Sequence, residues 1–322
     1  GEAGFRAVRR MAEAAAAALS LRAEDVLVCS TGVIGVPLPV EKIERQTAAL
    51  AAGLSKAGHE KAREAILTTD TVYKECAVET EIGGRTVHVG AMAKGSGMIH
   101  INMGTMLGFI ATDCAISAAL LDKALRESAA GTYNCVSVDG DTSTNDTLLI
   151  LANGRAGNAE IVADGEDFRA FLSALNAVNT EMAKKIAGDG EGAGHLLECR
   201  VSGAASTEQA RTLAKSVISS NLVKAAFFGR DANWGRVLCA LGYAGIDFAP
   251  ERASVRFESG AGGVELFREG APLAFDEARA KTVLSERDIR IEVSLGAGSA
   301  EGTAWGCDLT YDYVKINGDY RT

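Results

Sequence analysis

The chain has 322 residues, of which 47% are hydrophobic and 23% are charged. This composition is ordinary for a globular protein, and it excludes a disordered chain, a collagen-like fibre and a low-complexity segment. With 33 basic against 42 acidic side chains the formal net charge is −9. That charge argues against a nucleic-acid partner, because nucleic-acid-binding proteins carry a basic surface.

The patterns of cysteine, histidine and apolar residues narrow the class of protein further. The seven cysteines are odd in number and form no CxxC pair, a pattern typical of reduced thiols in a cytoplasmic protein. The four histidines show no HxxxH spacing, so we expect no metal site. No run of 18 apolar residues exists, and Glu13 interrupts the alanine-rich stretch 11–21. We therefore expect an amphipathic helix there, and neither a membrane span nor a signal peptide.

Helical and strand-like hydrophobic periods alternate along the chain. In chain order we expect a helix at residues 5–21, a strand at 25–29, helices at 40–53 and 60–67, strands at 75–82, 86–92 and 106–112, a helix at 116–128, a strand at 146–152, a helix at 166–186, a strand at 196–201, a helix at 206–219, a strand at 225–228, a helix at 233–241, and strands at 254–258, 289–295 and 303–311. Gly83 and Gly84 between two strands predict a hairpin turn. The class is mixed α/β, with layered sheets and helices outside.

A glycine-rich polar loop at residues 94–104 runs directly into an apolar strand, with Thr105 at the junction. The loop lacks the GxxxxGK[ST] spacing of a phosphate-binding loop, and a plain turn is one interpretation. The alternative makes Thr105 a nucleophile. A threonine hydroxyl needs an adjacent base, and cutting the preceding bond frees the residue's own α-amine for that purpose. Gly104 suits such a cut, because a residue without Cβ tolerates a strained backbone.

Two further polar junctions are candidates for function. The loop 30–35 follows an expected strand, where backbone N–H groups commonly face an oxyanion, although a plain turn is the simpler interpretation. The segment 228–236 precedes an expected helix, and Asp231 or Asn233 suits its N-cap. Arg230 and Arg236 in that segment fit either an anion site or a structural ion pair.

Five segments of the chain together resemble the ornithine acetyltransferase family, the glutamate N-acetyltransferases of the cyclic arginine pathway. They are residues 30–39, 94–113, 138–147, 229–236 and 304–322. The resemblance covers essentially the whole chain. It implies the family's layered αββα sandwich of mixed sheets, with a mechanism like that of the N-terminal-nucleophile (Ntn) hydrolases.

The resemblance also implies which residues act. In that family the precursor cuts itself before a threonine, and the matching cut here falls between Gly104 and Thr105, which makes Thr105 the nucleophile. It further implies that Thr31 and Gly32 form the oxyanion hole. The substrate contacts that it implies come from Thr71, Lys94, Thr105, Glu191, Asn317 and Thr322. Gly104 stands where alanine is more usual in the family, and Ile101 stands where proline is common.

The implied reaction moves the acetyl group of N2-acetylornithine to glutamate through an acetyl-Thr105 intermediate, without a cofactor. Charge supports these contacts, because Lys94 can neutralise the substrate carboxylate and Glu191 its ammonium, helped by the terminal carboxylate of Thr322. Some family members also accept acetyl-CoA and so make acetylglutamate directly, and these residues leave that use open.

The cut would give an α segment, 1–104, and a β segment, 105–322, which together form one catalytic unit, with a smaller C-terminal lobe as an option. The family's cut chains stay together and usually form a heterotetramer of two α and two β segments. The family's proteins also carry a further stretch before the region that matches Gly1, so we expect the α segment to be N-terminally truncated relative to them.

Two other functions fit the same residues. In a self-processing Thr-dependent amidohydrolase, water instead of an amine would resolve the acyl-threonine, and free acetate would form. In an inactive unprocessed paralogue, the chain would stay intact at Gly104–Thr105 and serve as a structural or regulatory partner.

Overall fold

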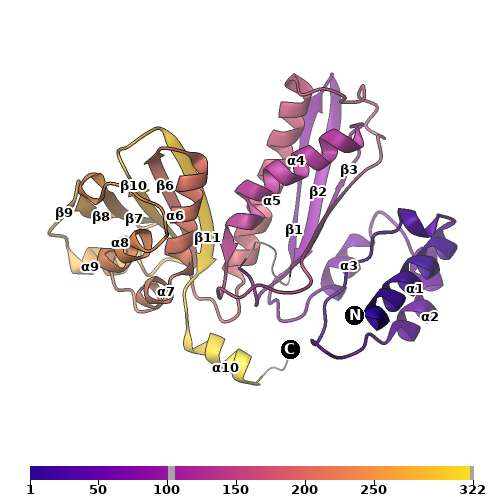
Figure 1. Cartoon of the computed structure of the whole chain (residues 1–322), viewed down its shortest axis with the longest axis horizontal. Helices are drawn as coiled ribbons and strands as arrows, with labels where there is room; N and C mark the ends of the chain where they lie inside the picture. The colour runs from indigo at the N-terminus through magenta and orange to yellow at the C-terminus, as the bar shows by residue number, and fades with distance from the viewer. Residues whose placement is uncertain (101–105, 320–322) are drawn as a thin grey trace. The chain divides into compact units, whose positions relative to one another are not determined.

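The chain divides into two compact units, which we describe separately from a computed structural model (Figure 1). The structure describes residues 1–100 and 106–319. The first unit contains Gly1–Ile66 together with the chain end from Gly318, and the second contains Leu67–Asn317.

Unit 1 is helical. Its amphipathic first helix packs on the second, with Ala12 and Ala16 of the first and Val40 of the second buried. Arg10 extends from the first helix to the carboxylate of Glu44, with two N–O distances of 2.8 and 2.6 Å. The predicted helices are confirmed, and the elements are α1 (Glu2–Leu19), the short 3-10 helix η1 (Ala23–Asp25), α2 (Val40–Ala52) and α3 (His59–Ala65).

The strand predicted at 25–29 is wrong. η1 ends at Asp25, and the residues that follow are irregular and make no strand pairing. Leu27 is 59% exposed, so the apolar run that suggested a buried strand is not buried. A strand needs a neighbour for its backbone hydrogen bonds, and none of the described residues supplies one here.

The first sheet of unit 2 has the order β1-β2-β3-β5. β1 and β2 form the predicted hairpin, and Gly83 and Gly84 at its turn have φ angles of +56° and +71°, which favour glycine. β3 pairs antiparallel with β2 and parallel with β5, so the sheet is mixed. The strands are β1 (Lys74–Ile82), β2 (Arg85–Lys94), β3 (Leu107–Thr112) and β5 (Thr147–Ala152).

The second sheet has the order β4-β11-β6-β10-β7-β8-β9. Its third strand, β6, pairs parallel with β10 and antiparallel with β11. Val201, Ile291 and Val293 on these strands are buried. The strands are β4 (Val136–Ser137), β6 (Leu196–Ala204), β7 (Ser254–Ser259), β8 (Gly262–Arg268), β9 (Ala271–Pro272), β10 (Asp288–Ser294) and β11 (Ala300–Cys307).

Helices cover both sheets (Figure 1). α5 packs on β1 and β2 and also contacts β6 and β11, so it ties the two sheets into one core. Its buried side chains recur at helical spacing, as at Phe168, Phe171, Leu175 and Val178. α6 covers β6 and β11. The helices of unit 2 are α4 (Ala118–Gly131), the 3-10 helices η2 (Tyr133–Cys135) and η3 (Pro250–Arg252), α5 (Glu166–Gly188), α6 (Thr207–Ser219), α7 (Asn221–Phe228), α8 (Trp234–Gly242), α9 (Glu277–Val283) and α10 (Tyr311–Asp319).

The mixed α/β class with mixed sheets is confirmed, but one strand predicted in unit 2 is wrong and another ends earlier than predicted. Residues 225–228 belong to helix α7, whose first turn is capped by the Ser220 hydroxyl accepting the Val223 N–H. A short apolar run does not distinguish a strand from a buried helical turn. The strand predicted at 303–311 ends at Cys307, because α10 begins at Tyr311.

Among the described residues, every helix falls short of the length and apolar character needed to cross a membrane.

The N-cap of α6 gives a local stability test. The Ser206 hydroxyl accepts the Gln209 N–H at 3.1 Å, whereas the Ser219 hydroxyl at the other end of α6 is buried without a partner among the described residues. We expect Ser206→Ala to lower the free energy of unfolding by about 1 kcal/mol, because the cap is lost. The matched control Ser219→Ala should be neutral or stabilising, since it removes an unpaired polar atom. Urea denaturation measures both, and equal losses in the two variants would contradict the cap assignment.

Candidate active site

Two loops of unit 2 meet at the carboxyl end of β2. The first loop follows Lys94, and the second is the turn between α5 and β6. The Ser96 hydroxyl donates to the carbonyl of Asp189 at 2.6 Å, and the Glu191 N–H donates to the carbonyl of Ser96 at 3.0 Å. A Cβ at Gly97 would lie 2.4 Å from the Glu191 carboxyl carbon. Glycine at position 97 therefore lets the two loops approach this closely.

A buried ammonium joins these loops to the start of β1. Lys74 is fully buried, and its Nζ lies 2.5 Å from carboxylate oxygens of both Asp70 and Asp189. The Thr71 hydroxyl and backbone N–H both donate to Asp189, and the Gly95 N–H donates to Asp70 at 2.7 Å. Each carboxylate thus accepts several hydrogen bonds besides its ion pair, which is the condition for burying such charges.

The ionisation of Asp70 reflects this environment. Burial raises the pKa of its carboxyl, but the Lys74 ammonium and the Gly95 N–H outweigh burial and lower the pKa below its usual value. Asp70 is therefore charged at neutral pH. Because its folded-state pKa is depressed, its contribution to stability is present above the unfolded-state pKa and is lost as the pH falls through the folded-state value.

Lys94 is a second buried ammonium with far fewer partners. It is 2% exposed, and its Nζ has one hydrogen bond among the described residues, to the Thr68 hydroxyl at 3.4 Å. Burial lowers the pKa of Lys94 below its usual value, although the charges of Asp70 and Asp146 oppose that shift. A buried cation without a directly bound carboxylate is suited to take an anionic group of a ligand.

Glu191 supplies the opposite charge. It is 8% exposed, and its Oε2 accepts a hydrogen bond from the Asn317 side-chain amide at 2.8 Å. No described Lys, Arg or His forms an ion pair with it. Within residues 1–100 and 106–319, the site therefore holds one buried cation and one buried anion that both lack a charged partner at salt-bridge distance, Lys94 and Glu191.

Asp146 holds the backbone where β3 begins. Its Oδ1 accepts the Met106 N–H at 2.7 Å, and the neighbouring Thr147 N–H donates to the Met106 carbonyl at 2.9 Å. The second carboxylate oxygen of Asp146 is buried and has no partner among the described residues. Burial raises the pKa of Asp146 to about 6, against the opposing effects of the Met106 N–H and the Lys94 charge.

The structure brings four of the predicted substrate contacts into one network. Thr71 is tied to Asp189 in the turn that carries Glu191, and Asn317 bonds to Glu191. Lys94 ends β2, directly before the loop that Ser96 joins to the same turn. The network as described does not include the other predicted site residues. Thr31 and Gly32 belong to unit 1, where Thr31 is half-buried and Gly32 exposed, and Gly104, Thr105 and Thr322 lie outside the described residues.

Sequence patterns do not predict the residues that organise this site. Asp70 stands in a Thr-Thr-Asp-Thr cluster, Lys74 begins a strand, and Asp189 stands in a glycine-rich helix end. None of these patterns signals a buried ion pair, because the partners lie 4 and 115 residues from Lys74. Asp146 had one available signal, its place immediately before the strand that pairs with β3.

The junction at 228–236 has the predicted N-cap. Asn233 accepts the Arg236 N–H at 3.1 Å at the start of α8, while Asp231 accepts from the Asn233 amide instead. Arg236 donates to the backbone carbonyl of Leu222 at 2.8 Å, so no structural ion pair forms there among the described residues.

Comparison with known proteins fits this geometry. Residues 1–322 match the ArgJ family. The chain belongs to that family. The arginine biosynthesis bifunctional protein ArgJ of Symbiobacterium thermophilum is 56% identical over 322 residues, which cover all of this chain and 79% of that protein. The arginine biosynthesis bifunctional protein ArgJ 1 of Clostridium acetobutylicum is 51% identical over 322 residues, which cover all of this chain and 79% of that protein.

A solved structure supports the fold as well as the family. The crystal structure of an arginine biosynthesis bifunctional protein ArgJ from Bacillus halodurans is 42% identical, with a TM-score of 0.63. The match covers 66% of this ArgJ-family chain and 98% of that chain. Residues 1–100 and 106–319 contain no group of three His, Cys, Asp or Glu side chains placed to hold a metal ion, and a metal-independent reaction stays a prediction.

The Lys74 ion pair gives a test of how the site is built. We expect Lys74→Met to lower the free energy of unfolding by about 3–5 kcal/mol at pH 7, because it leaves two buried carboxylates without a cation. The matched control is Arg126→Met, which removes an exposed pair with Asp122 whose side chains are 78% and 56% exposed. That control should cost less than about 1 kcal/mol. Urea denaturation measures both, and similar small losses would show that the buried pair is not structurally important.

Proposed function

We propose that this chain transfers the acetyl group of N2-acetylornithine to glutamate by double displacement on Thr105. The observation that carries this proposal is the pair of buried charges, Lys94 at the end of β2 and Glu191 in the turn that Ser96 binds. N2-acetylornithine has one carboxylate and one side-chain ammonium, and each needs a partner of opposite charge if it is to be buried. Membership of the ArgJ family supports the same reaction.

Self-cleavage prepares the nucleophile. The Thr105 hydroxyl attacks the Gly104 carbonyl carbon, the bond from that carbon to the Thr105 nitrogen breaks, and the nitrogen takes a proton to become a free α-amine. Water then hydrolyses the resulting ester, which restores the hydroxyl and leaves a carboxylate on Gly104. The α-amine is now available as the general base toward the hydroxyl of its own residue.

Transfer follows in two steps. The Thr105 hydroxyl gives its proton to the α-amine and attacks the acetyl carbonyl of the substrate. The family resemblance alone assigns Thr31 and Gly32 to the oxyanion hole, where a donor is typically worth about 3–4 kcal/mol. The bond to the α-nitrogen breaks, and that nitrogen leaves with the proton as ornithine's amine. The α-amine of glutamate then attacks the acetyl-threonine ester, which releases N-acetylglutamate and regenerates the hydroxyl.

The charged residues have distinct roles in this scheme. Lys94 binds the α-carboxylate of either substrate, and Glu191 binds the side-chain ammonium of ornithine. Glutamate has a carboxylate where ornithine has that ammonium. The Asn317 amide donates to Glu191 at 2.8 Å and to the Tyr313 carbonyl at 3.1 Å, so this second carboxylate would have to displace one of these hydrogen bonds to use it. Asp146 acts as a positioning residue, because the Met106 N–H that it binds belongs to the peptide group linking residue 105 to residue 106.

The remaining features of the proposal rest on the family resemblance. The cut divides the chain into segments 1–104 and 105–322, which stay together and assemble as two α and two β segments. The reaction needs no cofactor. The cytoplasmic location rests instead on the seven cysteines, which are odd in number and form no CxxC pair. Acetyl-CoA would be a second acetyl donor, and an assay with acetyl-CoA and glutamate alone tests it.

Intact-mass spectrometry of the denatured protein tests the nucleophile first. In the wild type we expect two fragments produced by cleavage between Gly104 and Thr105. In Thr105→Ala we expect one full-length species, and this variant should also lack acetyl transfer. The control Thr282→Ala removes an exposed hydroxyl that donates to the Ala278 carbonyl on α9, and it should leave both cleavage and transfer unchanged. Retained transfer in Thr105→Ala would rule out the mechanism. Free acetate in place of N-acetylglutamate would indicate the amidohydrolase, and an uncut wild-type chain the unprocessed paralogue.

Lys94 gives a pH-dependent test of substrate binding. The Lys94 side chain must be protonated to bind a carboxylate, and burial lowers its pKa. KM for N2-acetylornithine should therefore rise with pH in the alkaline range, and the rise should begin at a lower pH than it would for a lysine with an ordinary pKa. We expect Lys94→Met to raise KM roughly 30-fold or more at neutral pH and to remove this dependence on Lys94. The control Lys123→Met changes an exposed lysine paired with Asp164 and should leave KM unchanged. An unaltered KM in Lys94→Met contradicts the assigned role.

A further inference from the structure

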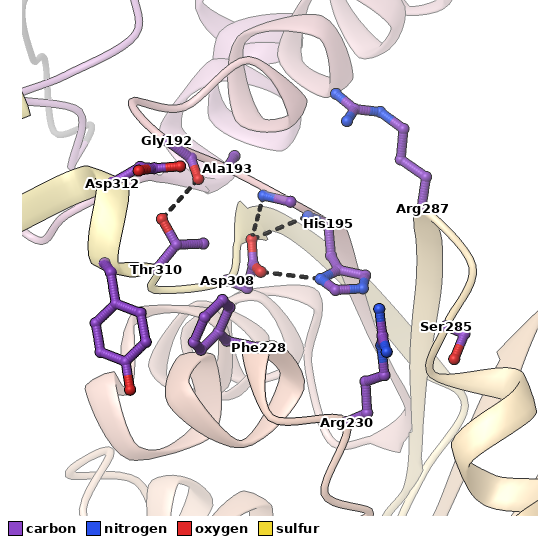
Figure 2. Close-up of a pocket in the computed structure, with 12 residues that line it drawn as sticks. Gly192, Ala193, His195, Phe228, Arg230, Ser285, Arg287, Asp308, Thr310 and Asp312 are labelled. Atoms are coloured by element: carbon purple, nitrogen blue, oxygen red, sulfur yellow. Dashed lines mark hydrogen bonds and ion pairs between the residues drawn. The ribbon is translucent and has the colours of Figure 1, made fainter.

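Unit 2 has a pocket of about 560 Å³ that is separate from the substrate contacts proposed above. Four segments line it: the turn before β6, the end of α7, the residues before β10, and the segment that joins β11 to α10 (Figure 2). Thr71, Lys94, Glu191 and Asn317 do not line it. Its volume is in the range of pockets that bind small molecules.

A fixed imidazole forms one wall of this pocket. His195 is 8% exposed, and its Nδ1 lies 2.9 Å from Oδ2 of Asp308. Burial raises the pKa of the Asp308 carboxyl, but hydrogen bonds from the His195 imidazole and from the backbone N–H groups of His195 and Gly194 outweigh it and lower the pKa. Asp308 is therefore a carboxylate, so Nδ1 of His195 carries the proton of this hydrogen bond. The other ring nitrogen, Nε2, has no partner among the described residues.

Arg230 adds positive charge beside that nitrogen, and Arg287 adds positive charge farther along the pocket. Figure 2 shows the side chain of Arg230 rising from the end of α7 toward the His195 ring. Its guanidinium donates no hydrogen bond to a described residue, and its φ of +53° is an unfavourable backbone conformation for arginine. Arg287 lines the same pocket and donates to the Gly188 carbonyl at 2.9 Å, which uses one of its five N–H groups.

The acids of the pocket do not cancel this charge. Asp308 is occupied by three hydrogen bonds, from the imidazole and two backbone N–H groups. Asp312 is in the first turn of α10 and lies on the other side of the pocket from His195 in Figure 2. The end of the pocket at His195 and Arg230 therefore favours an anion.

The neighbouring wall is aromatic. Phe228 and Tyr311 meet edge to face, with ring centroids 5.3 Å apart. Tyr311 is 82% exposed, which is unusual for so large a side chain and leaves its ring available for a ligand. Inorganic anions would fill only a small part of the pocket, so a ligand that matches it has an anionic group and an organic part.

We propose that this pocket binds a phosphorylated small molecule, with the phosphate held by His195 and Arg230, Arg287 at its edge, and the organic part against Phe228 and Tyr311. Arg230 offers a planar fork of N–H donors, and the imidazole, whose Nδ1 proton is on the Asp308 side, donates from Nε2 when it takes a second proton as the ligand binds. Two cations match the double negative charge of a phosphate better than the single charge of a carboxylate. The inference does not depend on acetyl transfer, because it concerns binding at residues outside the proposed reaction.

Imidazole NMR tests this directly, because the chain has only four histidines. Long-range ¹H–¹⁵N spectra of the full chain are recorded during titration with inorganic phosphate, phenyl phosphate and benzoate at constant ionic strength, and His195→Gln assigns the His195 signals. We expect both phosphates to shift the His195 signals saturably, with phenyl phosphate binding about 2- to 10-fold more tightly through the aromatic wall. Benzoate should bind more weakly than either phosphate.

Substitutions of the pocket arginines test whether the His195 signal reports binding in this pocket. Arg230→Asn should weaken phosphate binding about tenfold, and asparagine tolerates the left-handed backbone at that position. Arg287→Gln should weaken it less, and it keeps the test usable if Arg230→Asn does not fold. The control Arg200→Gln removes an exposed arginine that donates to Glu301 on the neighbouring strand and should leave binding unchanged. No shift of His195 with either phosphate, equal loss in the control, or tighter binding of benzoate would each overturn the proposal.

Discussion

The buried ammonium of Lys74 is the interaction on which the site depends. It contacts Asp70 before β1 and Asp189 after α5, so it joins segments more than a hundred residues apart. Replacing such a pair by apolar groups is often neutral for stability, but removing one member is costly. Its contribution is therefore geometric: the carboxylates it holds fix Thr71 and the Gly95 N–H, and with them the two loops that carry the proposed substrate contacts.

The polar groups of this network are largely satisfied by one another, and this leaves two charges for a ligand. Lys94 and Glu191 are both buried, yet neither has a partner of opposite charge within salt-bridge distance among the described residues. Burying such charges without a partner is unfavourable in the free protein. A ligand with complementary charges would pair with both groups and relieve this unfavourable energy, which would strengthen its binding. The site is preorganised in this sense.

Much of this could be predicted from the sequence, and the failures have physical causes. Long periodic segments such as α5 were found because burial of one helix face imposes a repeat on the residues. The apolar residues 225–228 were assigned to a strand because so short a run fits either period. Thr71, Lys94, Glu191 and Asn317 were named from the family's motifs, whereas Lys74 was not, since its partners are distant in sequence and its role depends on the fold.

The pairing of β2 with β3 has a consequence for a chain cut between residues 104 and 105. β2 lies before the cut and β3 after it, and their ladder runs from Val89 opposite Thr112 to Lys94 opposite Leu107. The two pieces would share one sheet and one apolar core, so they could part only by unfolding. Folding before the cut is unimolecular, but reassembly afterwards would need two molecules to meet. The cut protein would then refold in a concentration-dependent way, and the uncut chain would be the form suited to folding.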